Sequence, residues 1–247
     1  APLTRSELEF KGDDPTPQLQ LVSYQKGGLS RIRPAAEFPV GLDWMNTKRP
    51  MTIQGLKGKL VLLDFWTYCC INCMHVLPVL EQAEKEHSTH LVVVGVHTAK
   101  FSTEKETENI REAVMRYDIQ HPVVNDSGRL LWKEYGISTW PSLVLIDPEG
   151  YVVWKHSGEI PYKELDRILE LATKKYEKNL TGTPVAIDLD SKIAKPTPLR
   201  FPGKILADSA SDRLFVADSN HHRIVVSQLD GTVLDIIGSG SIGKKDG

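Results

Sequence analysis

The sequence predicts an α/β protein built in layers, followed by a shorter all-β unit. Between residues 59 and 176, short apolar runs rich in strand-forming residues alternate with stretches whose apolar side chains recur at helical spacing. This alternation is typical of layered α/β folds. After residue 200, short strand-like segments separated by turns replace the helices. We therefore divide the chain into an N-terminal extension (1–33), an α/β domain (34–178), a linker (179–200) and a β unit (201–247).

Each element follows from a local pattern. Residues 59–66 form an apolar run typical of a strand buried on both faces. Glu104 to Glu108 are expected to be a solvated helix start, where acidic side chains interact favourably with the helix dipole. The other predicted elements are a helix over 17–25, a hairpin over 44–56, a helix after residue 70, a strand over 91–97, a helix over 103–117, a strand over 122–126, a helix over 128–135, strands over 141–146 and 151–155, and a helix over 161–176.

All three cysteines lie between residues 69 and 73, where the first core strand passes into a helix. The free N–H groups and the dipole of a helix start stabilise an anion, which favours a reactive thiolate. Cys70, at the helix start, is therefore the candidate nucleophile. Cys73 follows one helical turn later, so its sulfur can reach the first and resolve a mixed disulfide.

These residues resemble the thioredoxin superfamily, and the resemblance extends beyond the cysteines. Asp64 lies six residues before Cys70, where thioredoxins keep a buried acid that moves protons for the second thiol. Pro78 lies five residues after Cys73, where thioredoxins kink this helix. The segment around Pro141 is similar to the cis-proline strand of the family, which faces the cysteines. Within the superfamily, the strand and helix over 91–117 indicate the subgroup related to peroxiredoxins and to bacterial cytochrome-maturation thioredoxins.

The resemblance also implies a substrate groove. Thr139, Trp140 and Pro141 would line it on one side, and Ile71 and Asn72 on the other. Three residues depart from the usual pattern: Cys69 replaces an aromatic residue, Asn72 replaces a proline or histidine, and Trp140 adds a bulky ring beside the cis-proline. Trp140 could also pack over the motif as part of the core. Cys69 is either a small residue in a tight position or a competitor of Cys70 for Cys73.

Two other uses of the cysteines stay open at this point. Cys69 and Cys73 have the spacing of thioredoxin-fold copper chaperones, with His75 or His97 as a third ligand, and soft thiolates favour Cu(I) or zinc. Thr67-x-x-Cys70 is similar to the peroxiredoxin motif, although the proline that normally precedes that threonine is absent. We expect neither a resident metal nor another cofactor.

The β unit resembles a different family. Residues 217–224 are similar to an NHL repeat, which forms one blade of a β-propeller, and residues 238–247 resemble the lead into a second repeat. His221 and His222 are interpreted as turn residues of the repeat rather than metal ligands. Propellers need about four to eight blades, so we expect the chain to be a fragment of a longer protein.

Composition excludes some classes of function. The net charge of −2 without a basic cluster gives no nucleic-acid footprint, and no apolar run reaches the ~18 residues that span a membrane. Three clustered cysteines do not form a secreted disulfide framework. No secretory leader is visible, although the chain begins with Ala1 rather than Met, which leaves a processed leader open. We expect a cytosolic monomer.

Two hypotheses for function follow. In the first, Cys70, Cys73 and Asp64 perform thiol–disulfide exchange on a protein partner, which the propeller recruits and the thioredoxin cleft binds. In the second, the departures at Cys69, Asn72 and Trp140 mark a scaffold that keeps a vestigial thioredoxin fold for protein interaction.

Overall fold

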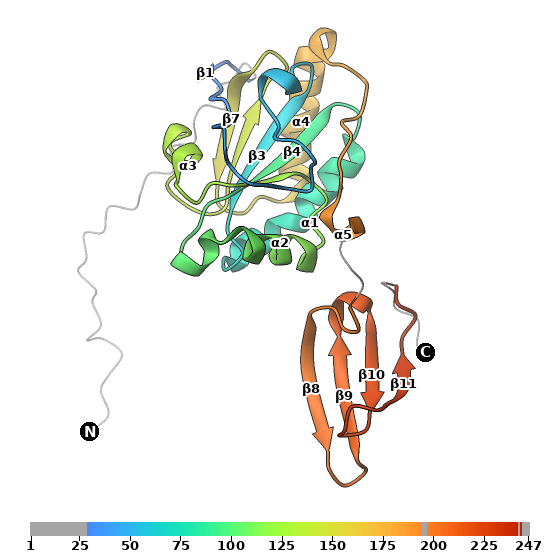
Figure 1. The fold of residues 1–247 in the computed structure, drawn as a ribbon. Helices are drawn as coiled ribbons and strands as arrows, with labels where there is room; N and C mark the ends of the chain where they lie inside the picture. The colour runs from blue at the N-terminus through green and yellow to red at the C-terminus, as the bar shows by residue number, and fades with distance from the viewer. Residues whose placement is uncertain (1–28, 194–196, 242, 244–247) are drawn as a thin grey trace, which may run out of the picture.

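The computed structural model describes residues 29–193, 197–241 and 243, which form two separate sheets (Figure 1). The helix predicted over 17–25 lies outside the described residues. The larger sheet has seven strands in the order β1-β7-β6-β3-β4-β5-β2. Its strands are β1 (Arg33–Pro34), β2 (Trp44–Met45), β3 (Leu60–Trp66), β4 (Leu91–His97), β5 (Val123–Asn125), β6 (Ser142–Ile146) and β7 (Tyr151–Ser157).

The centre of this sheet is mixed. β3, β4 and β5 are parallel to one another, whereas β6 is antiparallel to β3 and β7 is antiparallel to β6. The helices are α1 (Ile71–Glu86), α2 (Thr107–Arg116), α3 (Leu130–Glu134), α4 (Tyr162–Tyr176) and α5 (Asp190–Ile193), with 3₁₀ turns η1 (Gln54–Leu56), η2 (Ser102–Lys105), η3 (Glu177–Asn179) and η4 (Ser219–His221). This arrangement is the thioredoxin-like α/β fold that the sequence predicts.

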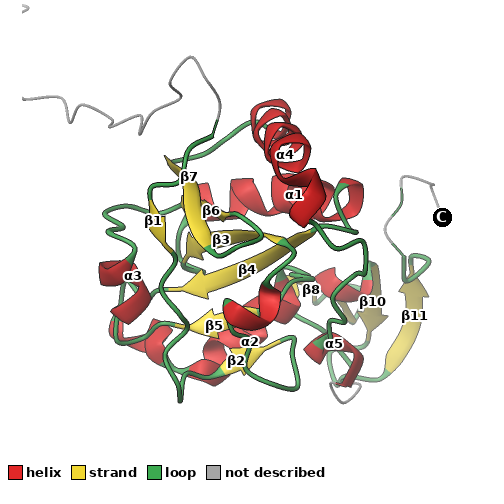
Figure 2. Cartoon of the chain, turned by 90° about the horizontal axis from the view of Figure 1, so that it is seen from above, coloured by secondary structure: helices red, strands yellow, loops and turns green. Residues whose placement is uncertain are grey.

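Helices cover both faces of β3, which is buried along its whole length. Because strand side chains alternate between faces, Leu60 and Leu62 pack in the cluster that α1 and α4 complete. Val61, Leu63 and Phe65 pack on the opposite face, where α3 contributes. Figure 2 shows α1 and α4 side by side on their face. Within the described chain, no helix has the length and apolar character needed to cross a bilayer.

The predicted hairpin over 44–56 is wrong. Trp44 and Met45 pair with β5, and residues 54–56 form the 3₁₀ turn η1. The chain leaves the strand at Asn46, which adopts a left-handed conformation with φ of 58°. The Asn46 amide then donates to the backbone carbonyls of Ile119 (2.7 Å) and His121 (3.0 Å). These bonds hold the segment against the loop before β5, so it does not fold back on itself.

The helix predicted over 103–117 is two elements. η2 ends at Lys105 and α2 begins at Thr107, because Glu106 between them is extended with ψ of 120°. The sequence predicts an apolar face of Ile110, Ala113, Val114 and Tyr117. The first three are buried, whereas Tyr117 follows the end of α2 and is 38% exposed.

The C-terminal unit is a four-stranded antiparallel sheet, β8 (Pro202–Asp208), β9 (Arg213–Asp218), β10 (Arg223–Ser227) and β11 (Val233–Ile237). The sequence predicts strands over 202–208, 213–224 and 229–233, and the second of these is divided by the turn η4. The third, 229–233, is a turn around Gly231 with φ of 95°, and the strand follows it. Asp218 is buried and organises η4, accepting from Arg200 N (2.6 Å), His221 Nδ1 (2.8 Å) and Arg223 Nε (2.7 Å).

Candidate redox site

The cysteine motif lies between the end of β3 and the start of α1. The Cys70 N–H donates to the Thr67 carbonyl (3.1 Å), which closes the turn after the strand. Cys70 is the N-cap of α1, and its Sγ accepts from the Cys73 N–H at 3.4 Å. The Cys70 sulfur thus occupies the place where a capping side chain satisfies a free N–H of the first turn.

The three thiols are free and differ in exposure. Cys69 is exposed, Cys70 is half-buried and Cys73 is buried. Burial, reinforced by the neighbouring Cys70 thiol and by Asp64, raises the pKa of Cys73 far above its ordinary value. Any reaction of Cys73 as a thiolate therefore needs a group that removes its proton.

Asp64 is placed to be that group. Its side chain lies on the same face of β3 as Leu62, toward α1, and the residue is 1% exposed. Neither carboxylate oxygen has a hydrogen-bond partner among the described residues. Burial raises the pKa of Asp64 to about 7; His121 opposes this shift and Glu84 adds to it. A carboxyl with this pKa can accept and release a proton near neutrality.

The predicted groove residues lie around the cysteines. The Trp140–Pro141 bond is cis, as the resemblance implies, and the pairing of Phe65 with Ser142 places Pro141 beside the end of β3. Trp140 and Cys70 pack against the same apolar cluster. The other three predicted contacts, Ile71, Asn72 and Thr139, are all exposed.

Trp140 is held in place by the fold. Its ring lies 4.3 Å from the ring of Trp132, centroid to centroid, and its Nε1 donates to the Thr98 carbonyl at 3.1 Å. The half-buried ring therefore forms a fixed wall beside the motif. One part of the ring packs in the core, and the exposed part is available to line a groove.

Glu104 is the site residue that sequence reasoning missed. The pattern predicted a solvated glutamate, but Glu104 is 0% exposed. Its carboxylate accepts from the Thr67 hydroxyl (2.7 Å) and from the N–H groups of Cys69 (3.2 Å), Lys100 (2.6 Å) and Phe101 (2.8 Å). Burial alone would raise its pKa, but these hydrogen bonds outweigh burial and lower the pKa of Glu104 to about 2. Nothing in the local sequence marks this role, because the residue three positions before Glu104 is Phe101, which lacks the side-chain oxygen of a capping box.

Glu104 also governs the extra cysteine. Although Cys69 is exposed as a residue, partial desolvation of its sulfur together with the adjacent Glu104 carboxylate raises the pKa of Cys69 to about 11. Cys69 therefore stays a thiol at neutral pH and is a poor nucleophile, since only the thiolate attacks. This leaves Cys70 as the attacking residue.

The two alternative chemistries find little support in the geometry. The described residues contain no group of three or more His, Cys, Asp or Glu side chains arranged to hold a metal. His75 faces Glu159 at 3.2 Å, and His97 is buried with its Nε2 accepting from the Tyr68 N–H at 3.4 Å. The Thr67 hydroxyl of the peroxiredoxin-like motif is bound to Glu104 rather than turned toward Cys70.

Fold and site together define a protein with a thioredoxin-type redox fold. The chain belongs to the thioredoxin-like family: a family model described as thioredoxin-like matches residues 58–152. Thioredoxin-like protein YneN of Bacillus subtilis is 31% identical over 152 residues, which cover 62% of this chain and 86% of that protein. A putative thiol:disulfide interchange protein DsbE from Chlorobium tepidum shares the fold, with a TM-score of 0.51 at 22% identity over 58% of this chain and 98% of that one.

Two longer relatives match most of the chain. NHL repeat-containing protein 2 of Bos taurus is 44% identical over 216 residues, 85% of this chain and 30% of that protein. Protein SUPPRESSOR OF QUENCHING 1, chloroplastic, of Arabidopsis thaliana is 49% identical over 219 residues, 85% of this chain and 21% of that protein. The resemblance to thioredoxin-like proteins with NHL repeats is therefore confirmed. The chain spans less than a third of the length of either relative.

Proposed function

We propose that this chain catalyses thiol–disulfide exchange on a protein substrate. The observation that carries the proposal is the asymmetry of the cysteine pair. Cys70 is accessible at the start of α1, while Cys73 lies buried one turn later beside the unpaired carboxyl of Asp64. An accessible attacking thiol and a protected resolving thiol are what two-step exchange requires.

The chemistry proceeds in two steps. The Cys70 thiolate attacks one sulfur of a substrate disulfide, the substrate S–S bond breaks, and the other substrate sulfur leaves as a thiolate. Cys73 then loses its proton to Asp64 and attacks Cys70 Sγ, which releases the second substrate sulfur. The substrate has gained two electrons and the protein holds a Cys70–Cys73 disulfide, which an external dithiol reduces. The same steps in reverse oxidise a substrate dithiol.

The substrate segment binds in an extended conformation along the groove. Thr139, Trp140 and Pro141 form one wall, and the exposed side chains of Ile71 and Asn72 form the other. The fixed indole of Trp140 narrows this groove, so it favours substrates with small residues next to the reacting cysteine.

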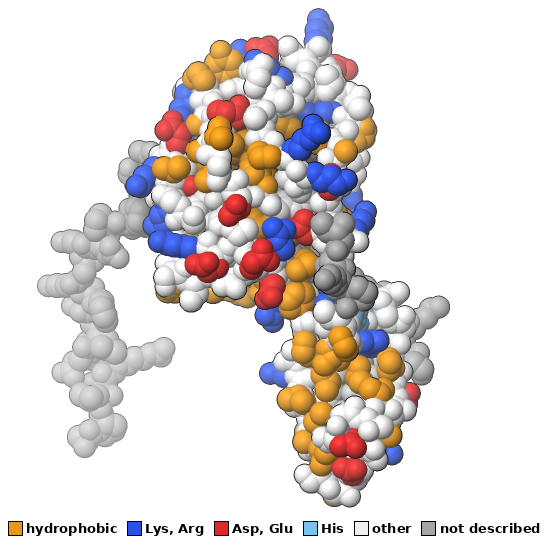
Figure 3. Space-filling model, in the orientation of Figure 1, with side chains coloured by type: hydrophobic (Ala, Val, Ile, Leu, Met, Phe, Trp, Pro, Cys, Tyr) orange, Lys and Arg blue, Asp and Glu red, His pale blue; other side chains and the backbone are white. Residues whose placement is uncertain are grey.

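The C-terminal sheet serves as one blade of a propeller that recruits the partner. Apolar side chains gather on the face of this sheet shown in Figure 3. The large apolar residues exposed on the sheet as a whole include Ile205 (68% exposed), Leu206 (65%) and Val233 (58%). Side chains of this kind are normally covered by neighbouring elements. The NHL repeats named in the Bos taurus relative are the candidates for that cover.

A redox titration tests the proposal. The protein is equilibrated in glutathione buffers, alkylated, and mapped by mass spectrometry. A reversible Cys70–Cys73 disulfide with a potential of roughly −200 to −270 mV is the expected result, and Cys69→Ser is the matched control that should leave it unchanged. The Cys73→Ser variant should then trap substrates on Cys70. The absence of any reversible disulfide would reject the proposal.

A scaffold function is the second candidate. It is favoured by the contact between the two units, in which the Asn220 amide of the C-terminal sheet donates to the Arg116 carbonyl at the end of α2 (2.7 Å). Under this hypothesis, a variant with all three cysteines changed to serine keeps its partners and its cellular function. Loss of function with an intact fold would reject it.

A further inference from the structure

Five buried polar atoms around the cysteine motif lack a hydrogen-bond partner within the described part of the chain. They are both carboxylate oxygens of Asp64, Nε1 of Trp66, Nε2 of His121 and Nδ1 of His97. Leaving a buried polar atom unpaired costs about 1–3 kcal/mol, so five in one region require an explanation. A site that must move protons is one place where such atoms are retained.

Gly95 explains how His121 comes close to Asp64. Gly95 is the register partner of Asp64 on β4. A Cβ at this position would lie 3.0 Å from Trp66 Nε1 and 3.3 Å from His121 Nε2, closer than side chains normally approach. Because Gly95 has no side chain, the His121 ring can pack against the face of β4 at the position that pairs with Asp64.

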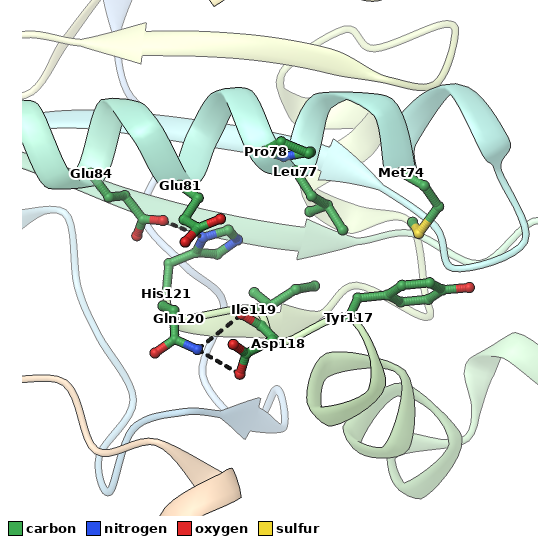
Figure 4. A pocket seen from close by; sticks show the side chains of 10 residues that line it. All are labelled: Met74, Leu77, Pro78, Glu81, Glu84, Tyr117, Asp118, Ile119, Gln120 and His121. Carbon is green, nitrogen blue, oxygen red and sulfur yellow. Dashed lines mark hydrogen bonds and ion pairs between the residues drawn. The ribbon is translucent and has the colours of Figure 1, made fainter. Parts of the chain in front are cut away.

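The opposite edge of the imidazole faces a carboxylate. His121 Nδ1 lies 3.2 Å from Glu84 Oε2, with the His121 side chain 3% exposed and the Glu84 side chain 19% exposed. Both residues line a cavity of about 230 Å³ along α1, whose lining also includes the exposed side chains of Glu81 and Asp118 (Figure 4). His121 thus lies on the cavity side of Asp64, with which it interacts electrostatically, and lines a cavity that reaches the surface.

We propose that His121 and Glu84 carry the proton of Cys73 from Asp64 to solvent through this cavity. The inference rests on the proposed exchange reaction. Asp64 takes the proton as Cys73 attacks Cys70 Sγ. It then passes the proton to His121 Nε2, directly or through one water, while the proton on Nδ1 moves to Glu84 and leaves. His121 acts only through Asp64 and touches no reacting atom.

Charge around the imidazole suits this role. Burial opposes protonation of His121, but Glu84 and Asp64 outweigh it, and the pKa of His121 is raised. A raised pKa makes the imidazole a better acceptor for the proton that Asp64 releases, and the Glu84 carboxylate stabilises the protonated ring. Glu81 and Asp118 are the other carboxylates of the cavity and attract the departing proton.

The test follows the second step alone. Reduced protein is mixed with oxidised glutathione and quenched in acid, and mass spectrometry follows conversion of the Cys70–glutathione adduct into the Cys70–Cys73 disulfide from pH 5.5 to 8.5. His121→Gln is expected to slow this step by about tenfold near pH 7, below the hundredfold typical of a direct base. His87→Gln is the matched control, because His87 is also buried and paired with a carboxylate, Asp166 at 2.8 Å.

Chemical rescue separates proton transfer from a structural role. Imidazole in the buffer should restore most of the rate of His121→Ala and leave the wild-type rate unchanged. If the His121 variants do not fold, Glu84→Gln tests the relay instead, because Glu84 is partly exposed. This variant is expected to form the Cys70–Cys73 disulfide several-fold more slowly than wild type. A wild-type rate in Glu84→Gln or in folded His121→Gln at every pH overturns the relay alone. Failure of the wild type to form the disulfide overturns the proposed function instead.

Discussion

Replacing Asp64 with asparagine tests whether the buried carboxyl has the raised pKa on which the reaction depends. The pKa of Asp64 rises from 3.8 to about 7 because the group is buried. Each pKa unit corresponds to about 1.4 kcal/mol, so ionising this carboxyl in the folded protein costs about 4 kcal/mol. Asparagine keeps the shape of the side chain and cannot ionise.

The sign of the effect follows from proton linkage. Between about pH 4 and pH 7 the folded protein holds a proton on Asp64 that the unfolded chain has released. The free energy of unfolding therefore falls by about 1.4 kcal/mol per pH unit across this window and levels off above pH 7. From pH 5 to pH 8 the Asp64 contribution falls by about 3 kcal/mol, and Asp64→Asn removes this loss.

The assay is denaturant unfolding of reduced protein at pH 5 and pH 8, followed by tryptophan fluorescence. All five tryptophans lie before residue 155, so the signal reports the α/β unit. The stability of Asp64→Asn relative to wild type should increase by about 3 kcal/mol from pH 5 to pH 8. Asp188→Asn, with a side chain 45% exposed, controls for net charge. If the difference in unfolding free energy between Asp64→Asn and wild type is the same at pH 5 and pH 8, the pKa of Asp64 is not raised and the proposed relay is refuted.

Three further predictions concern other contacts. Glu104→Gln should lower the free energy of unfolding by about 2 kcal/mol at pH 7 but by little at pH 3. Because the pKa of Glu104 is about 2 in the folded protein, its carboxylate stabilises the fold fully above about pH 4.5, and this stabilisation is lost as the pH falls toward 2. Urea unfolding at both pH values measures the difference. Trp140→Phe removes the donor to the Thr98 carbonyl and should lower stability by about 1 kcal/mol, while faster reaction of Cys70 with a peptide disulfide would show that the indole narrows the groove. Asp218→Asn removes the charge that pairs with Arg223 and should increase amide hydrogen exchange across β8–β11, with exchange unchanged in β3 and β4.

Local patterns explain which parts were predictable. The run over 60–66 is buried on both faces, and the helix begins directly after Cys70, so strand, motif and helix follow from neighbouring residues. The hairpin over 44–56 failed because β2 pairs with a strand almost 80 residues later, Trp44 with Val124. Nothing in the local pattern specifies such a partner.

The same limit applies to the site. Glu104 reaches Thr67 across 37 residues, and His121 reaches Glu84 across 37 residues. From the sequence, each acidic residue looks like a solvated position on a helix. Only the packing of η2 and the loop before β5 against the motif brings these carboxylates to buried partners.

The two buried carboxylates beside the motif have opposite properties, and the number of hydrogen-bond donors decides between them. Glu104 has four donors, so burial is overcome and its pKa falls to about 2. Asp64 has none among the described residues, so burial prevails and its pKa rises to about 7. Glu104 therefore keeps a fixed charge that holds the loop and keeps Cys69 protonated. Asp64 changes its charge in the range where Cys73 must lose a proton. Exchanging these environments would leave the resolving thiol without a base, so the placement of donors around Glu104 is as much a part of the chemistry as their absence around Asp64.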